Sequence, residues 1–229
     1  MHSELAALAR ACALPLTSFR SEHVAQQVER ACRREQVDGA DGLARALGRD
    51  DEARRRFRRS VAISHSSLFR DPEQFTLLED VLLPRLLAGG ARLSAWSAGC
   101  SDGAELHTLA LVLERMGALD RALLLGSDLL EENLALARAA DYPLAAQTRM
   151  RWERRDLVAD GPPAGRWRLV LCRNVAIYLE PDARRRLYAT LASALATHGI
   201  LLLGRSERLL DPLALGLRPA GPHAYERLA

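Results

Sequence analysis

The stretch from Leu93 to Gly103 constrains the fold most, because it has the pattern of a buried strand followed by a tight turn. Gly99 and Gly103 end the apolar run, and Glu105 to Met116 then shows the apolar periodicity of a helix. Glycine lets a ligand approach the backbone closely, and the start of the helix offers N–H groups to the polar part of that ligand. Because Gly-x-Ser-x-Gly is neither a phosphate loop nor a full dinucleotide fingerprint, a turn without a ligand remains an alternative.

A second strand and helix follow directly along the chain. The apolar run from Ala122 ends at Asp128, and Glu131 to Ala140 has helical periodicity. An acid at the tip of the strand next to a glycine turn is placed to accept both hydroxyl hydrogens of a ribose. The pattern therefore favours nucleoside binding, with the alternative that Asp128 is only the N-cap of the following helix.

The rest of the chain continues to alternate between strands and helices. Strands are predicted at 150–157, 167–172 and 199–204, with a last strand at 217–228 that Pro219 and Pro222 interrupt. Helices are predicted at 72–87 and 182–197. Alternation at this spacing predicts an α/β fold built on a doubly wound sheet.

The first sixty residues lack strand signals and predict a bundle of three or four short helices. We therefore expect a helical domain over residues 1–70, including its linker, and an α/β domain over 71–229. Arg30, Arg33 and Arg34 crowd the end of an amphipathic segment. The helix dipole favours cations at that position, which is one sufficient explanation for them.

Composition narrows the classes of function. All 32 basic residues are arginine, the net charge is only +3, and acidic residues interrupt the arginine clusters, so we expect no nucleic-acid partner. The four cysteines lack metal-site spacing, and neither a signal peptide nor a membrane-spanning run is present. These features predict a cytoplasmic protein with no bound metal and no direct membrane insertion.

Five strings taken together resemble the CheR-type chemotaxis receptor glutamate O-methyltransferases. They are Leu-Phe-Arg-Asp-Pro (68–72), Trp-Ser-Ala-Gly-Cys-Ser-Asp-Gly (96–103), Ser-Asp-Leu (127–129), Cys-Arg-Asn-Val-Ala-Ile-Tyr-Leu (172–179) and Gly-Arg-Ser-Glu (204–207). The resemblance implies a Rossmann-like class I methyltransferase domain preceded by a small all-α domain. It also implies S-adenosyl-L-methionine as cofactor, and methyl esterification of glutamate side chains on a chemoreceptor-like or other signalling protein.

The resemblance also implies roles for individual residues. Arg70 and Tyr178 would be catalytic, with Arg70 beside the methionine carboxylate and Tyr178 beside the reacting centre. The residues implied to bind the cofactor are Ser64, Ser66, Arg70, Gly99, Gly103, Glu105, Asp128, Asp156, Leu157, Arg173 and Asn174. The implied docking surface for the substrate protein is Arg30, Arg33 and Arg34. On residue type alone, the favoured explanation is an ion pair with Asp71 or a helix end for Arg70, and packing at the end of a strand for Tyr178.

Three departures from the family pattern affect the function. Ser64 stands where the family usually has asparagine, and Ala104 stands where it has the first of two glutamates, which leaves Glu105. Residues 144–149 stand where the family inserts an antiparallel β-subdomain that binds receptor tails, and so short a connection holds only a turn. We therefore expect no tail-tethered receptor binding. The alternative function is a degenerate, non-catalytic module that acts by protein binding in a chemosensory or signalling system.

Overall fold

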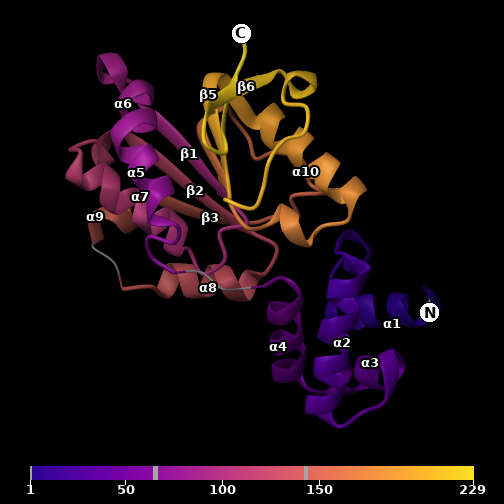
Figure 1. The fold of residues 1–229 in the computed structure, drawn as a ribbon. Coiled ribbons are helices and arrows are strands. Elements are labelled where there is room, and N and C mark those ends of the chain that lie inside the picture. The colour runs from indigo at the N-terminus through magenta and orange to yellow at the C-terminus, as the bar shows by residue number, and fades with distance from the viewer. Residues whose placement is uncertain (1, 64–66, 142–143) are drawn as a thin grey trace. The chain divides into compact units, whose positions relative to one another are not determined.

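The computed structural model describes residues 2–63, 67–141 and 144–229 (Figure 1). It divides into two compact units. The helical unit comprises residues 1–64 together with 178–184, and the sheet unit comprises 65–177 together with 185–229. The predicted domain boundary at residue 70 stays a prediction.

The helical unit contains the short helices predicted for the first sixty residues. They are α1 (His2–Cys12), α2 (Ser21–Glu35), α3 (Gly39–Arg49) and α4 (Asp51–Val61). Leu8, Leu43 and Phe57 are fully buried, so the apolar stripes of these helices form the core of the unit. The segment that returns from the sheet unit joins it through backbone hydrogen bonds, since Arg20 N donates to Tyr178 O at 2.9 Å.

The sheet unit is built on seven strands in the order β3-β2-β1-β4-β5-β7-β6. Their bounds are β1 (Leu93–Ala98), β2 (Ala122–Asp128), β3 (Met150–Arg154), β4 (Trp167–Cys172), β5 (Leu195–Leu203), β6 (Leu217–Gly221) and β7 (Ala224–Arg227). Neighbouring strands from β3 to β5 are parallel, whereas β7 is antiparallel to both β5 and β6. This sheet confirms the predicted Rossmann-like architecture.

Helices connect and cover the strands. Their bounds are α5 (Pro72–Leu77), α6 (Leu83–Leu86), α7 (Ala104–Arg115), α8 (Glu131–Ala139), α9 (Leu144–Gln147) and α10 (Pro181–Ala194). Short 3-10 segments are η1 (Leu16–Ser18), η3 (Ala88–Gly90), η4 (Leu119–Arg121), η5 (Ala176–Tyr178) and η6 (Leu213–Leu215), and η2 (Leu78–Leu82) is a π-helical turn. The predicted helix at 72–87 is therefore interrupted by η2. Leu83 N donates to Leu78 O, five residues earlier, which is the hydrogen-bond spacing of a π-helix. Pro84, the next residue, has no N–H to donate.

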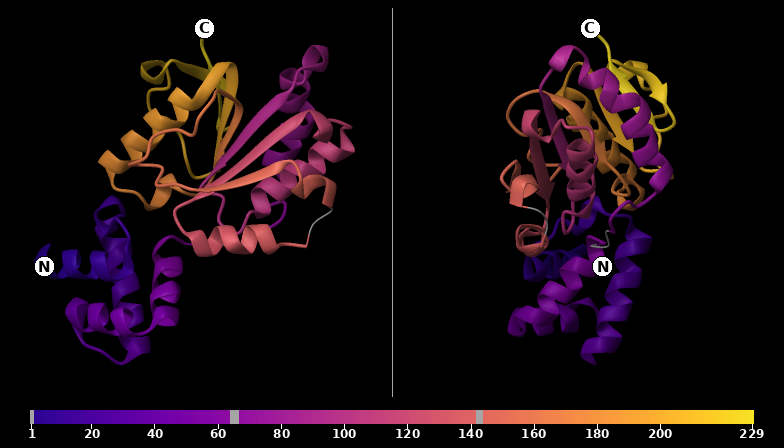
Figure 2. Two further views of the ribbon diagram at one scale, coloured as in Figure 1. Left: turned by 180° about the vertical axis from the view of Figure 1, so that it is seen from behind. Right: turned by 90° about the vertical axis from the view of Figure 1, so that its left-hand side faces the viewer.

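The two faces of the sheet are covered unequally. The β1–α7–β2 and β2–α8–β3 connections step toward one edge of the sheet, whereas β4–α10–β5 steps toward the other. Right-handed crossovers therefore place α7 and α8 on the face opposite α10 (Figure 2). Leu109, Leu124 and Leu169 belong to the core on the α7 face, which also includes α5 and α6.

The C-terminal tail differs from the single interrupted strand expected from the sequence. It forms a hairpin of β6 and β7, in which β7 lies between β5 and β6. Pro219 lies on β6 at the edge of the sheet, where its missing N–H leaves no ladder bond unmade, and Pro222 lies between the strands. The prolines therefore mark an edge strand and a turn.

Candidate active site

The strand order reverses between β1 and β4, and ligands of doubly wound sheets bind where the carboxyl ends of such strands diverge. Asp128 ends β2 at this place and is almost fully buried. Its Oδ2 accepts a hydrogen bond from Ser101 N at 2.9 Å. Its Oδ1 accepts from Leu130 N at 2.9 Å and from Asn133 Nδ2 at 3.0 Å. Asp128 therefore joins the turn after β1 to the turn before α8.

The alternative role for Asp128 is wrong, because α8 begins at Glu131 and its N-cap is Leu130. Burial raises the pKa of the Asp128 carboxyl, although the hydrogen bonds from Leu130, Ser101 and Asn133 oppose that shift. A carboxylate offers about four acceptor positions, and three are already used. One position on Oδ2 is left for a ligand, which suffices for one ribose hydroxyl rather than the two expected.

Gly99 lies in the turn after β1 with a φ of +78°, a conformation that favours glycine. A Cβ at this position would lie 2.6 Å from Val175 Cγ2 and 3.7 Å from Leu157 Cδ1. The structure therefore brings the predicted residues Gly99 and Leu157 together. Val175, for which the sequence suggested no role, completes this apolar wall.

Gly103 is explained by packing. Its φ is +85°, and a Cβ there would lie 2.7 Å from the Trp152 ring and 2.8 Å from Ala137 Cβ. Trp152 on β3 and Ala137 on α8 therefore require the glycine whether or not a ligand is bound. A role for Gly103 in cofactor binding stays a prediction.

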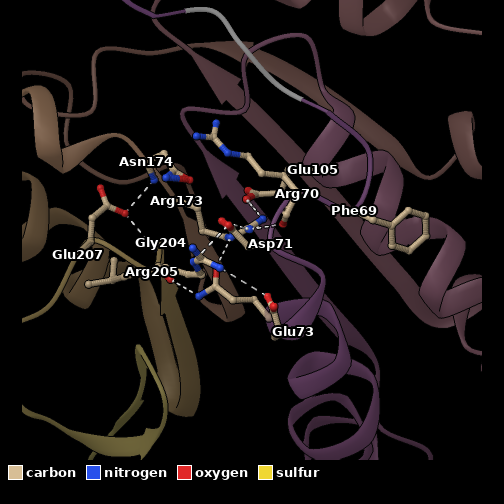
Figure 3. A network of polar contacts seen from close by, with 12 residues as sticks. Phe69, Arg70, Asp71, Glu73, Glu105, Arg173, Asn174, Gly204, Arg205 and Glu207 are labelled. Atoms are coloured by element: carbon tan, nitrogen blue, oxygen red, sulfur yellow. Dashed lines mark hydrogen bonds and ion pairs between the residues drawn. The ribbon is translucent and has the colours of Figure 1, made fainter.

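Arg173 is the centre of a buried polar network at the end of β4 (Figure 3). Its Nε donates to Gln74 Oε1 at 2.7 Å, and its Nη1 donates to Glu105 Oε2 at 3.2 Å. Its Nη2 donates to Asp71 Oδ2 at 3.0 Å and also to the backbone oxygen of Arg70. One guanidinium therefore joins the segment before α5, the first turn of α7 and the end of β4.

The network carries a negative balance of charge. Glu105 Oε1 also accepts a hydrogen bond from Ser97 Oγ at 2.7 Å. Arg205, which is half exposed, lies 3.4 Å from Asp71 and 3.8 Å from Glu73. Two arginines, Arg173 and Arg205, thus face three carboxylates, Asp71, Glu73 and Glu105, which leaves a net charge of −1. Such a cluster suits a cationic group of a ligand.

Arg70 lies beside this network and is exposed. Its backbone faces Arg173, whereas its guanidinium points away from the ion pairs in Figure 3. Asp71, the alternative partner of Arg70, pairs with Arg173 and Arg205, and the predicted roles of Arg70 stay predictions.

Glu207 is a site residue to which the sequence analysis gave no role. Its side chain is nearly fully buried, and Oε1 accepts from Val175 N at 2.9 Å and Ala176 N at 2.7 Å. Oε2 accepts from Asn174 N and Gly204 N, each at 2.8 Å. One carboxylate therefore fixes the backbone after both β4 and β5. The available signal was the Gly-Arg-Ser-Glu string directly after a buried strand.

Strained backbone gathers around this site. Phe69, Asp71, Ser101 and Asn174 have φ values of 52°, 56°, 53° and 60°. Each such residue costs about 1–3 kcal/mol, and these conformations cluster at functional sites. Ser101 Oγ and Asn174 Oδ1 are also buried without a hydrogen-bond partner among the described residues. Unpaired polar atoms at the tips of β1 and β4 fit a ligand that supplies their partners.

The roles predicted for the remaining residues, Ser64, Ser66, Asp156 and Tyr178, stay predictions. Ser64 and Ser66 lie outside the described residues. Asp156 uses Oδ1 to accept from Val158 N at 2.9 Å and Ala159 N at 3.2 Å, which closes its own turn. Tyr178 belongs to the helical unit, where its ring centroid lies 5.4 Å from that of His23.

The docking arginines also belong to the helical unit, and all three are exposed. Arg33 is paired with Glu29, and Arg34 with Glu35 at 3.0 Å. Neighbouring acids therefore already neutralise two of the three charges. A docking role for Arg30, Arg33 and Arg34 stays a prediction.

Other kinds of site are not found in the described part of the chain. Its His, Cys, Asp and Glu side chains form no group suited to a metal ion, and no helix there is long and apolar enough to cross a bilayer. All four cysteines are free. Burial raises the pKa of the Cys100 and Cys172 thiols, so both are unreactive packing residues at neutral pH.

Comparison with known proteins gives consistent matches. The family model described as "CheR methyltransferase, SAM binding domain" matches residues 64–150 and 144–215. The chemotaxis protein methyltransferase of Listeria monocytogenes is 32% identical, over 69% of this chain and 70% of its own length. Chemotaxis protein methyltransferase 1 of Vibrio cholerae is 29% identical, over 62% of this chain and 63% of its own.

Solved structures also match part of the chain. A TehB-like SAM-dependent methyltransferase from Corynebacterium glutamicum is 16% identical with a TM-score of 0.43, over 68% of this chain and 92% of that one. The glycopeptide N-methyltransferase MtfA in complex with S-adenosyl-L-homocysteine is 21% identical with a TM-score of 0.42, over 49% of this chain and 43% of that one.

Proposed function

Because this chain belongs to the CheR methyltransferase family and contains that family's SAM-binding domain, we propose that it methylates glutamate side chains of a chemoreceptor-like protein. S-adenosyl-L-methionine is the cofactor. The observation that most supports catalysis is the Arg173 network, in which one guanidinium holds both the backbone oxygen of Arg70 and the Glu105 carboxylate.

The residues around the strand tips fit each part of the cofactor. The unused acceptor position of Asp128 Oδ2 would take a ribose hydroxyl, and Gly99, Leu157 and Val175 would form the apolar wall beside the adenine. The negative cluster that contains Asp71 and Glu105 would attract the cationic amino group. Ser101 Oγ and Asn174 Oδ1 would gain the partners that they lack in the ligand-free fold.

The proposed reaction demands little acid–base chemistry from the chain. Bound S-adenosyl-L-methionine supplies a methyl group that its positive sulfur has already activated. A glutamate side chain is ionised at neutral pH, since its ordinary pKa is about 4.3, so no residue has to remove a proton. The chain's task is to hold that carboxylate in line with the methyl group, which is worth roughly 7–11 kcal/mol. Arg70 and Tyr178 are suited to orient a carboxylate by hydrogen bonds.

Substrate capture would be independent of a receptor tail. Between α8 and β3, the described residues 144–149 include only the four-residue helix α9, where the family inserts its β-subdomain. We propose that the exposed arginines of α2 contribute to docking and that the protein acts in the cytoplasm, in keeping with its free cysteines.

One observation favours the alternative, a non-catalytic binding module. Both oxygens of Glu105 are already engaged, by Ser97 and by Arg173, and the neighbouring position is Ala104. If neither carboxylate of the network turned to the cofactor's amino group, affinity would fall. Isothermal titration with S-adenosyl-L-methionine and S-adenosyl-L-homocysteine separates the two functions. We expect micromolar binding, whereas no detectable heat would favour the module.

Asp128→Ala tests the place of the cofactor. Losing a hydrogen bond to a charged acceptor costs about 1.5–3 kcal/mol, so we expect cofactor affinity to fall at least tenfold. Asp41→Ala, an exposed change on α3 of the helical unit, is the matched control and should bind as the wild type does. Equal affinities of both variants would place the cofactor elsewhere.

The transfer itself is tested with methyl-labelled cofactor and membranes that hold candidate chemoreceptors. We expect base-labile methyl esters on the receptor. At saturating cofactor, Arg70→Gln should reduce their formation at least a hundredfold, because the guanidinium would orient the acceptor carboxylate as well as contact the methionine carboxylate of the cofactor. Formation at the wild-type rate by Arg70→Gln would remove Arg70 from the catalytic residues.

A further inference from the structure

A second cleft opens at the amino ends of β1, β2 and β3, at the opposite end of these strands from the candidate active site. Its volume is about 540 Å³, within the range of small-molecule sites. Four arginines line it, namely Arg92, Arg121, Arg149 and Arg151, and Leu123 is part of the lining. All of these residues belong to the sheet unit.

The cleft exists because this part of the sheet has no covering helix. The connection between β3 and β4, residues 155–166, forms no helix, and α7 and α8 cover the other face. Leu123 points away from that face, since its neighbour Leu124 is in the α7-side core. Leu123 is 43% exposed as a result, which is unusual for an apolar residue on a strand that is paired on both sides in a parallel sheet.

The charge of the lining is strongly positive. Four arginines against one aspartate, Asp120, give a net charge of +3, equal to that of the whole chain. Arg149 lies 3.3 Å from Asp120. The side chains of Arg92, Arg121 and Arg151 have no carboxylate within ion-pair distance among the residues that the structure describes. Three of the four arginines of this lining are thus without an ion-pair partner in the part of the chain that the structure describes.

The chemistry of the lining indicates the class of ligand. Guanidinium groups bind phosphate oxygens through paired hydrogen bonds, and several arginines together match a group with more than one negative charge. The exposed Leu123 side chain offers an apolar surface for a ring or sugar. We propose that this cleft binds a small molecule that carries two or more phosphate charges and has the size of a nucleotide. The site is independent of the proposed methyl transfer.

Calorimetric titration of the full chain with pyrophosphate and with ATP tests this proposal. ATP contains adenosine, so it is titrated into protein that S-adenosyl-L-homocysteine has already saturated, which blocks the proposed cofactor site. We expect one binding event with a micromolar dissociation constant when ATP is titrated into the saturated protein. We expect the same for pyrophosphate titrated into protein without S-adenosyl-L-homocysteine. No heat from either ligand at millimolar concentration would overturn the proposal.

Variants then locate the site. The double variant Arg92→Gln with Arg151→Gln changes two exposed side chains that have no ion pair to lose, so its thermal unfolding should match the wild type. We expect at least tenfold weaker ATP binding and unchanged binding of S-adenosyl-L-homocysteine. Arg186→Gln on the exposed face of α10 is the matched control. Equal ATP affinity in all three proteins would overturn the proposal, and so would binding of a single-stranded oligonucleotide in the absence of any ATP binding.

Discussion

Arg173 Nη1 lies 3.2 Å from Glu105 Oε2, although 68 residues separate the two in sequence. The same guanidinium also contacts Asp71, and its side chain is only 3% exposed. A buried arginine between two carboxylates joins strand β4 to helix α7 and to the segment before α5. The stability of the site and its charge therefore depend on one side chain.

Replacing Arg173 by methionine should destabilise the chain. The variant leaves Glu105 partly buried without its cation and leaves Asp71 only the more exposed Arg205, and removing one partner of a buried pair costs about 3–5 kcal/mol. Urea unfolding measures the change, with Arg186→Met as the control on an exposed helix face. A loss below about 1 kcal/mol would show that water replaces the guanidinium.

Glu207→Gln should release the backbone after β4. The glutamine amide keeps one acceptor oxygen, but its NH2 group takes the place of the other oxygen. That NH2 group is a donor, so the two backbone N–H groups that it faces lose their acceptor. Each buried N–H left unpaired costs about 1–3 kcal/mol. We expect faster hydrogen exchange at Asn174, Val175 and Ala176 and a lower free energy of unfolding. Glu114→Gln, an exposed change on α7, should alter neither, and unchanged exchange in Glu207→Gln would contradict the assigned role.

Gly99→Ala should weaken cofactor binding through two separate effects. The left-handed backbone at φ +78° costs a non-glycine residue about 1–2 kcal/mol, and the new Cβ would meet Val175 Cγ2 at 2.6 Å. Combining it with Val175→Ala removes the second effect only. Calorimetry should therefore show partial recovery of affinity in the double variant compared with Gly99→Ala. No recovery would mean that the clash is relieved by movement of Val175.

Glu226 should make stability depend on pH. Burial raises the pKa of this carboxyl, but hydrogen bonds from His198, Arg218 and Arg85 outweigh burial, and the pKa lies below its ordinary value of 4.5. A lowered pKa means that the folded chain binds the proton less tightly than the unfolded chain does. The stabilisation is therefore fully present above pH 4.5 and is lost as the pH falls through the folded-state pKa.

Glu226→Gln tests this dependence. Because the arginine and histidine partners are half exposed or more, we expect the variant to be less stable by only about 1–3 kcal/mol at pH 7. The difference from the wild type should shrink as the pH falls below 4.5 and through the folded-state pKa, because the protonated carboxyl is as uncharged as the amide. Urea unfolding at several pH values measures it. A difference that stays constant with pH would rule out the ionised carboxylate as its source.

Much of the fold was predictable because hydrophobic periodicity is a local property of the chain. The strands at 93–98, 122–128 and 167–172 match the prediction, as do the helices of the first sixty residues. The prediction was wrong where pairing between distant segments sets the outcome. The strand predicted at 199–204 begins at Leu195, because Leu195 pairs with Trp167, and the tail folds into a hairpin with β7 beside β5.

The site was predictable only in part. Gly99, Glu105, Asp128 and Arg173 were selected from motifs, and the structure places them around the tips of β1, β2 and β4. Gln74, Val175 and Glu207 were missed. The Gly-Arg-Ser-Glu string marks Glu207, but its partners are backbone N–H groups about 30 residues earlier, which nearly every residue type has, so the string does not reveal the contact.

The sequence by itself determined the order of strands and helices, the glycine turn after β1 and the motifs of the family, since each depends on residues that are close along the chain. Only the tertiary structure decided that Arg173 lies between Asp71 and Glu105, and that the amino ends of β1 to β3 form a basic cleft. Both depend on which strands lie side by side and on which face lacks a helix. Those arrangements are set by the packing of the whole sheet, and that packing cannot be read from any short stretch of sequence.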